Sequence, residues 1–303
     1  MNAVTRPSRA GDRVFSGIVT AAGILILAIL AGVAIFLLVR GWPALTAKAE
    51  DLPGDESFLR YVWPLAFGTI LSSAIAIVIA VPLAVGAALF ITFFAPKKLA
   101  NALAALVDLL AAIPSVIYGL WGIAVLGPAA KGLHKWLYEH LDFLPFFKGP
   151  PSPTGRTMFT LGIVLAVMIL PIISAIVREV FAQTPRSLRE GSLALGATRW
   201  EMIRMTVLPF GRPAIISASM LGLGRALGET MAVALILSVS GGVTFNLISS
   251  GNPSTIAANI ALNFPESSGL AINLLIATGL VLFGITLLVN TAARLIISRQ
   301  IRA

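Results

Sequence analysis

Long apolar runs, almost free of charged residues, alternate with short polar segments along the chain. Uncharged runs of about twenty residues or more are typical of transmembrane helices, whereas the strands of a membrane β-barrel would alternate apolar and polar residues. The pattern therefore predicts an all-α polytopic membrane protein, a single domain over residues 1–303 with six transmembrane helices. The predicted spans cover about 14–39, 61–95, 99–126, 157–177, 213–240 and 270–293.

Composition supports a membrane protein and argues against a metal or thiol centre. Of the 303 residues 57% are hydrophobic and only 12% charged, against about 25% charged in a typical soluble domain. There is no cysteine, and two histidines are too few for a histidine-based metal site. We therefore expect no metal or cofactor in this chain. The first apolar run is too long for the core of a signal peptide, so we expect it to be retained as a span.

The basic residues are unevenly divided between the two sides of the predicted membrane segments. Fourteen Lys and Arg residues lie on the side of the termini and seven on the other side, with Arg225 inside a span. Lys and Arg are enriched in cytoplasmic loops of membrane proteins. This bias predicts cytoplasmic N- and C-termini, and it explains the net charge of +9 without a nucleic-acid partner.

A polar, arginine-rich segment over residues 183–212 interrupts the apolar pattern on the basic side. Gly196 is placed to end a first short helix, and Thr198 with Glu201 forms a capping box that opens a second. Trp200 is expected on the apolar face of the second helix. Such a helix suits docking into a groove of a partner protein, but it would also suit an interfacial helix on anionic lipid, and the pattern alone favours neither.

Two charged residues lie one helical turn apart inside the predicted fifth span, Arg225 and Glu229. With a helical rise of about 1.5 Å per residue, Arg225 is expected near mid-membrane. Charges at this depth are costly and usually functional, so we expect Arg225 to bind an oxyanion beside Glu229 in a substrate pathway. The alternative is a structural ion pair, with Asp108 of the third span as a possible third member. Asp108 alone would also suit a contact between helices.

The polar segment resembles the cytoplasmic signature of ABC-importer permeases. The signature reads EAA, three residues, G, nine residues and I-x-L-P. It corresponds here to Glu190-Gly191-Ser192, Gly196 and Thr206-Val207-Leu208-Pro209. The spacing is the same, while Gly191, Ser192 and Thr206 depart from the pattern. The resemblance implies a type I importer fold in which residues 183–212 form a coupling loop to a separate ATPase. The residues carried over to that role are Glu190, Gly196, Ala197, Trp200, Leu208 and Pro209.

A closer resemblance to the PstC-type permeases of bacterial phosphate importers extends over nearly the whole chain. It is carried by LGLGRALGETMAV around Arg225, AAIPSVIYGLWG at 111–122 and MILPII at 168–173. It implies a non-catalytic permease in the bacterial inner membrane that forms half of a pathway for inorganic phosphate. Arg225 and Glu229 match residues that the family assigns to transport. The implied partners are a PstA-type permease, a PstB-type ATPase dimer that binds ATP and Mg²⁺, and a PstS-type phosphate-binding protein.

Other functions remain open at this stage. The chain could carry another oxyanion, such as molybdate or sulfate. A secondary carrier coupled to protons could also use a buried Arg–Glu pair, although it would not need the coupling-loop spacing. A sensory or scaffolding membrane protein is a third alternative. The sequence contains no GxxxxGK[ST] motif, so ATP hydrolysis is not expected in this chain.

Overall fold

The structure, a computed structural model, describes residues 9–237 and 242–301 of the chain. Within this part six helical segments are long and apolar enough to cross a membrane, so the protein is all-helical with six candidate spans, as predicted. They cover Gly11–Thr46, Phe58–Phe94, Ser115–Leu141, Met158–Ala182, Arg199–Leu227 and Leu270–Leu295. Arg6, Arg302 and the last three residues of the predicted fifth span lie outside the described residues.

The helices differ widely in length. The long ones are α1 (Arg9–Thr46), α2 (Phe58–Leu89), α6 (Met158–Ala182), α9 (Leu208–Leu227) and α12 (Leu270–Ile301). The shorter ones are α3 (Lys97–Ala111), α4 (Ser115–Trp121), α5 (Gly127–Leu141), α7 (Arg186–Ala194), α8 (Arg199–Met202), α10 (Met231–Ile236) and α11 (Ile256–Asn263). Three π-helical turns, η2 (Phe90–Phe94), η3 (Gly122–Leu126) and η4 (Ile203–Val207), join helices or end them, and two 3₁₀ turns are η1 (Ala49–Asp51) and η5 (Phe264–Glu266).

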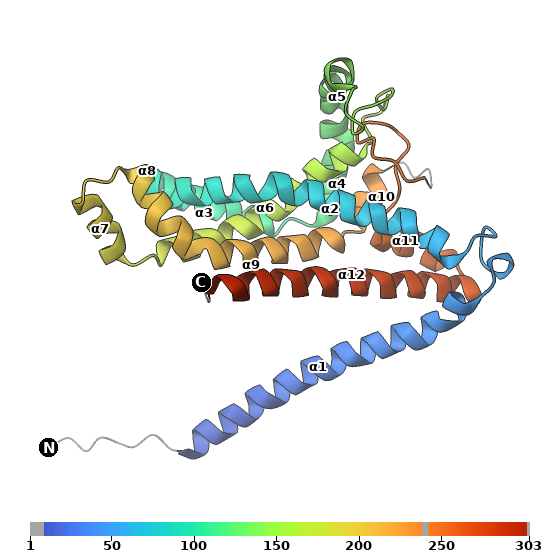
Figure 1. The fold of residues 1–303 in the computed structure, drawn as a ribbon, viewed down its shortest axis with the longest axis horizontal. Helices are drawn as coiled ribbons and strands as arrows, with labels where there is room; N and C mark the ends of the chain where they lie inside the picture. Colours follow the sequence, from blue (N-terminus) through green and yellow to red (C-terminus); the bar gives the residue numbers. More distant parts are fainter. Residues whose placement is uncertain (1–8, 238–241, 302–303) are drawn as a thin grey trace.

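Helix α6 lies at the centre of the bundle and packs against α2, α3 and α9 (Figure 1). Its largest side chains, among them Leu165, Ile169 and Phe181, are fully buried. Helix α2 approaches it with a row of small residues at four-residue spacing, all fully buried: Ala76, Ala80, Ala84 and Ala88. Small residues on one face allow two helices to pack closely without hydrophobic side chains holding them apart.

Helix α1 leaves the bundle except at its last turns, where it contacts α12 (Figure 1). There Gly41 lies so close to Ala277 that an added β-carbon would come within 3.1 Å of the Ala277 Cα, and Ala44 is fully buried. Most side chains from Val14 to Val39 are exposed in the isolated chain. This apolar surface is the part of the span expected to contact lipid or another membrane subunit.

The predicted third span is not one helix. The chain breaks after Ala111, and Pro114 takes an extended backbone conformation (ψ 140°) before α4 begins. A proline disfavours the helical conformation at the residue before it and has no N–H to donate, so the break falls where the sequence has Pro114. From α4 the chain continues through η3 into α5, which stands across the direction of the long helices (Figure 1).

The predicted fifth span also differs from the observed helices. It begins earlier, because Pro209 and Pro213 lie within α9 and do not break the helix. The π-helical turn η4 leads directly into α9, and the Leu208 N–H donates to the carbonyl oxygen of Ile203. The span ends earlier as well, because α9 stops at Leu227 and α10 starts only at Met231.

The two ends of the bundle carry different elements. One end carries α7 and α8 together with the start of α1 and the last turns of α12, and the other carries α5 and the loop after α10 (Figure 1). At this second end the Arg156 guanidinium donates to the carbonyl oxygens of Leu235 (2.8 Å) and Ile236 (3.2 Å). These bonds satisfy carbonyls that the end of α10 leaves without helical partners.

Candidate functional site

Arg225 lies in the last turn of α9, and the glycines around it have different roles. Gly222 faces α6 so closely that an added β-carbon would lie 2.9 Å from Ile173 Cδ1. This contact fixes which face of α9 is buried. Gly224 has open space where its side chain would be, and Arg225 beside it is exposed. Gly222 is thus a point of close approach between α9 and α6, and the next turn presents Arg225 on an open surface.

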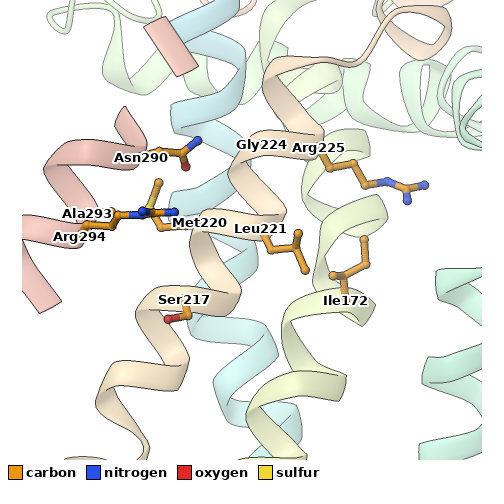
Figure 2. A pocket seen from close by; sticks show the side chains of 9 residues that line it. All are labelled: Ile172, Ser217, Met220, Leu221, Gly224, Arg225, Asn290, Ala293 and Arg294. Atoms are coloured by element: carbon orange, nitrogen blue, oxygen red, sulfur yellow. The ribbon is translucent and has the colours of Figure 1, made fainter. Parts of the chain in front are cut away.

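An open cavity of about 770 Å³ lies on this surface of α9, between α6 and α12 (Figure 2). Its lining is Ile172, Ser217, Met220, Leu221, Gly224, Arg225, Asn290, Ala293 and Arg294. Arg225 extends from α9 on the side away from α12, whereas Asn290 and Arg294 extend from α12 toward α9 (Figure 2). Two of these residues carry a positive charge and none carries a carboxylate, so the lining favours an anion.

Glu229 makes no ion pair with Arg225 in the described residues, so the alternative of a structural Arg225–Glu229 pair is not observed. Arg225 is the third residue from the end of α9, and Glu229 comes after the break, so the two do not share a helical turn. Glu229 is 7% exposed, and its Oε1 accepts a hydrogen bond from the Ala232 N–H at 3.1 Å. The carboxylate thus satisfies an N–H in the first turn of α10, which no helical carbonyl can reach. No ion pair within the described residues includes Arg225.

Asp108 belongs to a different place. It lies on α3 and pairs with Arg178 of α6, whose Nη2 is 3.3 Å from one carboxylate oxygen and 3.4 Å from the other. Asp108 does not line the Arg225 cavity. Arg178 was not among the predicted site residues, because it follows directly after the uncharged run of the fourth span. The end of that run was the only sequence signal for it.

The polar segment forms two short helices around a glycine, as predicted. Gly196 has a positive φ of 88°, its N–H donates to the Leu193 carbonyl, and the Ala197 N–H donates to the Ser192 carbonyl. These two bonds form a Schellman motif that ends α7. The predicted capping box is present, because Thr198 and Glu201 exchange hydrogen bonds at the start of α8.

The residues carried over to the coupling role differ in exposure. Ile203 and Val207 anchor η4 in the main core with no exposed surface, whereas Trp200 is 57% exposed, so it does not share their buried face. Glu190, Gly196 and Pro209 are also exposed, and Ala197 and Leu208 are half-buried. Leu195, at the tip of the segment, is 91% exposed. The segment therefore presents apolar side chains to its surroundings while its second helix is fixed in the bundle.

Sequence reasoning missed three polar residues of the cavity: Ser217, Asn290 and Arg294. Arg294 directly follows the predicted sixth span, which was given as 270–293, although α12 continues past it. A signal was present, since Asn290 is a polar residue inside an apolar span and lies four residues, one helical turn, before Arg294.

The fold is that of the membrane subunits of ABC importers. The chain superimposes on a subunit of a bacterial alginate ABC transporter, solved with an alginate-pentasaccharide-bound periplasmic protein, with a TM-score of 0.63. The two share 17% identity, and the match covers 94% of this chain and 93% of that one. A subunit of the inward-facing MetNI methionine ABC transporter gives a TM-score of 0.53 at 18% identity, covering 80% of this chain and 95% of that one.

Sequence comparisons identify the family. Residues 80–302 match the family model of the binding-protein-dependent transport system inner membrane component. The phosphate transport system permease protein PstC 2 of Mycobacterium tuberculosis is 48% identical, over 96% of this chain and 93% of the relative. PstC of Haemophilus influenzae is 38% identical, over 91% and 90%. The chain belongs to the binding-protein-dependent transport system inner membrane component family, and within it to the PstC permeases.

This membership has direct consequences. The chain is a multi-pass inner-membrane permease component and a non-catalytic subunit of an ABC importer. The family implies three kinds of partner, namely a substrate-binding protein, an ATPase and a partner permease.

Proposed function

We propose that this chain forms one half of the pathway through which an ATP-driven importer moves inorganic phosphate across the inner membrane. The observation that carries the proposal is the Arg225 guanidinium, which lines an open cavity without a carboxylate and has no ion-pair partner in the described residues. The phosphate-transport names of relatives at 38–48% identity support the choice of anion.

The chemistry of arginine suits this role. A guanidinium is planar, stays charged at all physiological pH values and donates two parallel hydrogen bonds to an oxyanion. A positive charge left without a partner at membrane depth is costly, and a phosphate passing beside it offsets that cost. Binding must also be weak enough for release. An arginine on an open cavity meets that need better than a closed cage of donors.

Glu229 and Asp108, the other two proposed pathway residues, act in this scheme by holding helices in place. Glu229 sits four residues after Arg225 and caps the first turn of α10, so it sets where the α9–α10 break falls. Asp108 links α3 to α6 through Arg178, and α6 in turn supports α9 at Gly222. Both residues would then influence the pathway through the position of α9.

The finer partner assignment follows from the same group of relatives. We assign a PstA-type permease as the other half of the pathway, a PstB-type ATPase dimer as the source of energy, and a PstS-type protein as the donor of phosphate. The end of the bundle with α7 and α8 is then cytoplasmic, together with both termini. Glu190, Gly196, Ala197, Trp200, Leu208 and Pro209 would form the coupling surface, with the exposed Trp200 and Leu195 as the apolar part that enters the ATPase.

The test is phosphate uptake by the complete importer, reconstituted in liposomes that contain ATP. Arg225→Gln should abolish uptake while leaving the membrane level of the complex and the co-purified ATPase unchanged, and Arg225→Lys should keep part of the rate because it keeps the charge. Wild-type uptake by Arg225→Gln would contradict the pathway role. Competition with sulfate and molybdate identifies the anion, and uptake that survives an uncoupler but stops without ATP excludes a proton-coupled carrier.

A further inference from the structure

The cavity beside Arg225 is lined by a second arginine, Arg294, which has no part in the function proposed above. Arg294 lies on α12, one helical turn after Asn290, and both line the cavity together with Ser217 of α9. We propose that Arg294, with Asn290 and Ser217, forms a second oxyanion site on the cytoplasmic side of Arg225. The proposal rests on the proposed phosphate pathway and extends it by one step toward the cytoplasm.

The two arginines are attached to their helices at different heights in the bundle. Helices α9 and α12 run in opposite directions, and Figure 2 shows Asn290 at the height of Gly224 and Arg294 at the height of Met220. Met220 precedes Gly224 by four residues, or about 6 Å along the helix. The backbone of Arg294 therefore lies about one turn closer than that of Arg225 to the end of the bundle that carries α7 and α8, and the two side chains extend on opposite sides of α9 (Figure 2).

The polar side chains that line the cavity have no hydrogen-bond or ion-pair partners within the described residues. They are the side chains of Ser217, Arg225, Asn290 and Arg294. Other serines on these helices do bond to the backbone, as Ser219 does to the Ile215 carbonyl at 2.7 Å. The donors on the cavity are thus available, and two of them are cationic. In a lining without a carboxylate, the group that satisfies them is an anion.

Residues on one face of α9 would line the path of the anion. Ser217, Met220, Leu221 and Gly224 lie at i, i+3, i+4 and i+7 and form one face of α9. An anion leaving Arg225 along this face would otherwise meet only apolar side chains before the membrane surface. A second set of donors, one turn closer to the end with α7 and α8, would divide the dehydrated path into two short steps. Ions pass readily when each of several sites binds them weakly.

The shared chemistry of this site is a phosphate group, and it has two sources. One is the transported phosphate, to which the proposal commits. The other is an anionic lipid headgroup, because Arg294 lies toward the C-terminal end of α12, close to the end of the predicted sixth span. Arg13 is a suitable control, since it is an exposed arginine near the start of α1, at the same end of the bundle, and lies outside the Arg225 cavity.

The experiment measures phosphate uptake by the reconstituted importer in liposomes of phosphatidylcholine alone and in liposomes that also contain phosphatidylglycerol. Arg294→Gln should lower the maximal uptake rate about tenfold in both lipids, because it removes a charge-assisted hydrogen bond. The concentration of phosphate-loaded binding protein that gives half-maximal uptake should not change, since Arg294 acts after Arg225. Arg13→Gln should match the wild type in both lipids.

Two results would overturn the proposal. One is wild-type uptake by Arg294→Gln in both lipids, and the other is a loss seen only with phosphatidylglycerol and shared by Arg13→Gln, which would assign Arg294 to lipid. If Arg294→Gln fails to assemble, Asn290→Ala decides in its place, with about a threefold loss expected for a neutral hydrogen bond. Arg225→Gln distinguishes failure of the second site from failure of the proposed pathway. Normal uptake by Arg225→Gln would contradict the phosphate pathway itself. Loss of uptake in Arg225→Gln with normal uptake in Arg294→Gln would contradict the second site alone.

Discussion

Arg178 on α6 places its Nη2 3.3 and 3.4 Å from the two carboxylate oxygens of Asp108 on α3. The Arg178 side chain is 20% exposed and Asp108 is 56% exposed. The second terminal nitrogen of Arg178, Nη1, is buried without a hydrogen-bond partner in the described residues. Asp108 is thus the counterion of a mostly buried cation. Arg178 needs this counterion more than Asp108 needs Arg178, because Asp108 is largely in contact with the surroundings.

Removal of the carboxylate should therefore cost more than removal of the arginine. We expect Asp108→Asn to lower the stability of the complex by about 1–3 kcal/mol, because it leaves a desolvated charge uncompensated, and Arg178→Gln to cost less. Thermal inactivation of the detergent-solubilised complex measures both. Phosphate uptake should fall only in proportion to the loss of stability in both variants. Reduced uptake at unchanged stability would instead place Asp108 in the pathway.

The hydrogen bond from the Ala232 N–H to Glu229 predicts different outcomes for two substitutions at the same position. Glu229→Ala leaves a buried N–H without an acceptor, so it should destabilise the start of α10 by about 1–3 kcal/mol. Glu229→Gln keeps a side-chain oxygen at the same place and should preserve stability and assembly. Limited proteolysis of the purified complex within residues 228–237 measures the loosening. Equal cleavage of the two variants would show that the charge, and not the hydrogen bond, holds α10.

Gly196 and Gly191 form a matched pair for testing the turn between α7 and α8. A β-carbon at either position would meet no atom within 4 Å, so the two differ only in backbone conformation. Gly196→Ala forces an alanine into a positive φ of 88° and should cost about 1 kcal/mol. Gly191→Ala lies within α7 and should favour the helix by up to about 1 kcal/mol. Co-purification of the ATPase should fall for Gly196→Ala and be kept for Gly191→Ala. Equal loss would mean that the turn conformation is not what the partner requires.

The helices could be predicted from the sequence because their causes are local. Runs of apolar residues predicted six spans, and Gly196 and the Thr198–Glu201 pair predicted the turn and the cap of the polar segment. The predicted helix limits were wrong near prolines, because hydropathy does not show whether a helix ends or continues at a proline. Pro114 follows the end of a helix inside an apolar run, while Pro209 lies in the first turn of α9 and Pro213 lies inside α9 without ending it.

The site was only partly predictable, because its residues come from helices far apart in the sequence. Arg225 could be found alone, since an arginine inside an apolar span is conspicuous. Its relation to Glu229 could not, because helical spacing assumes a continuous helix and α9 ends between them. Arg178 and Arg294 acquire their partners and surroundings only through the packing of α6 on α3 and of α12 on α9.

Trp200 and Trp42 allow a controlled test of the exposed polar segment. Their exposures are 57% and 58%, but Trp200 is at the start of α8 and Trp42 near the end of α1, at the opposite end of the bundle. If Trp200 inserts into the ATPase, Trp200→Ala should weaken that complex by about 2 kcal/mol, as expected for a central aromatic residue of an interface. Co-purification of the ATPase and ATP-dependent uptake should then fall together, while Trp42→Ala keeps both. If the segment instead lies on lipid, Trp200→Ala keeps the ATPase bound and changes only the affinity of an isolated α7–α8 peptide for anionic vesicles.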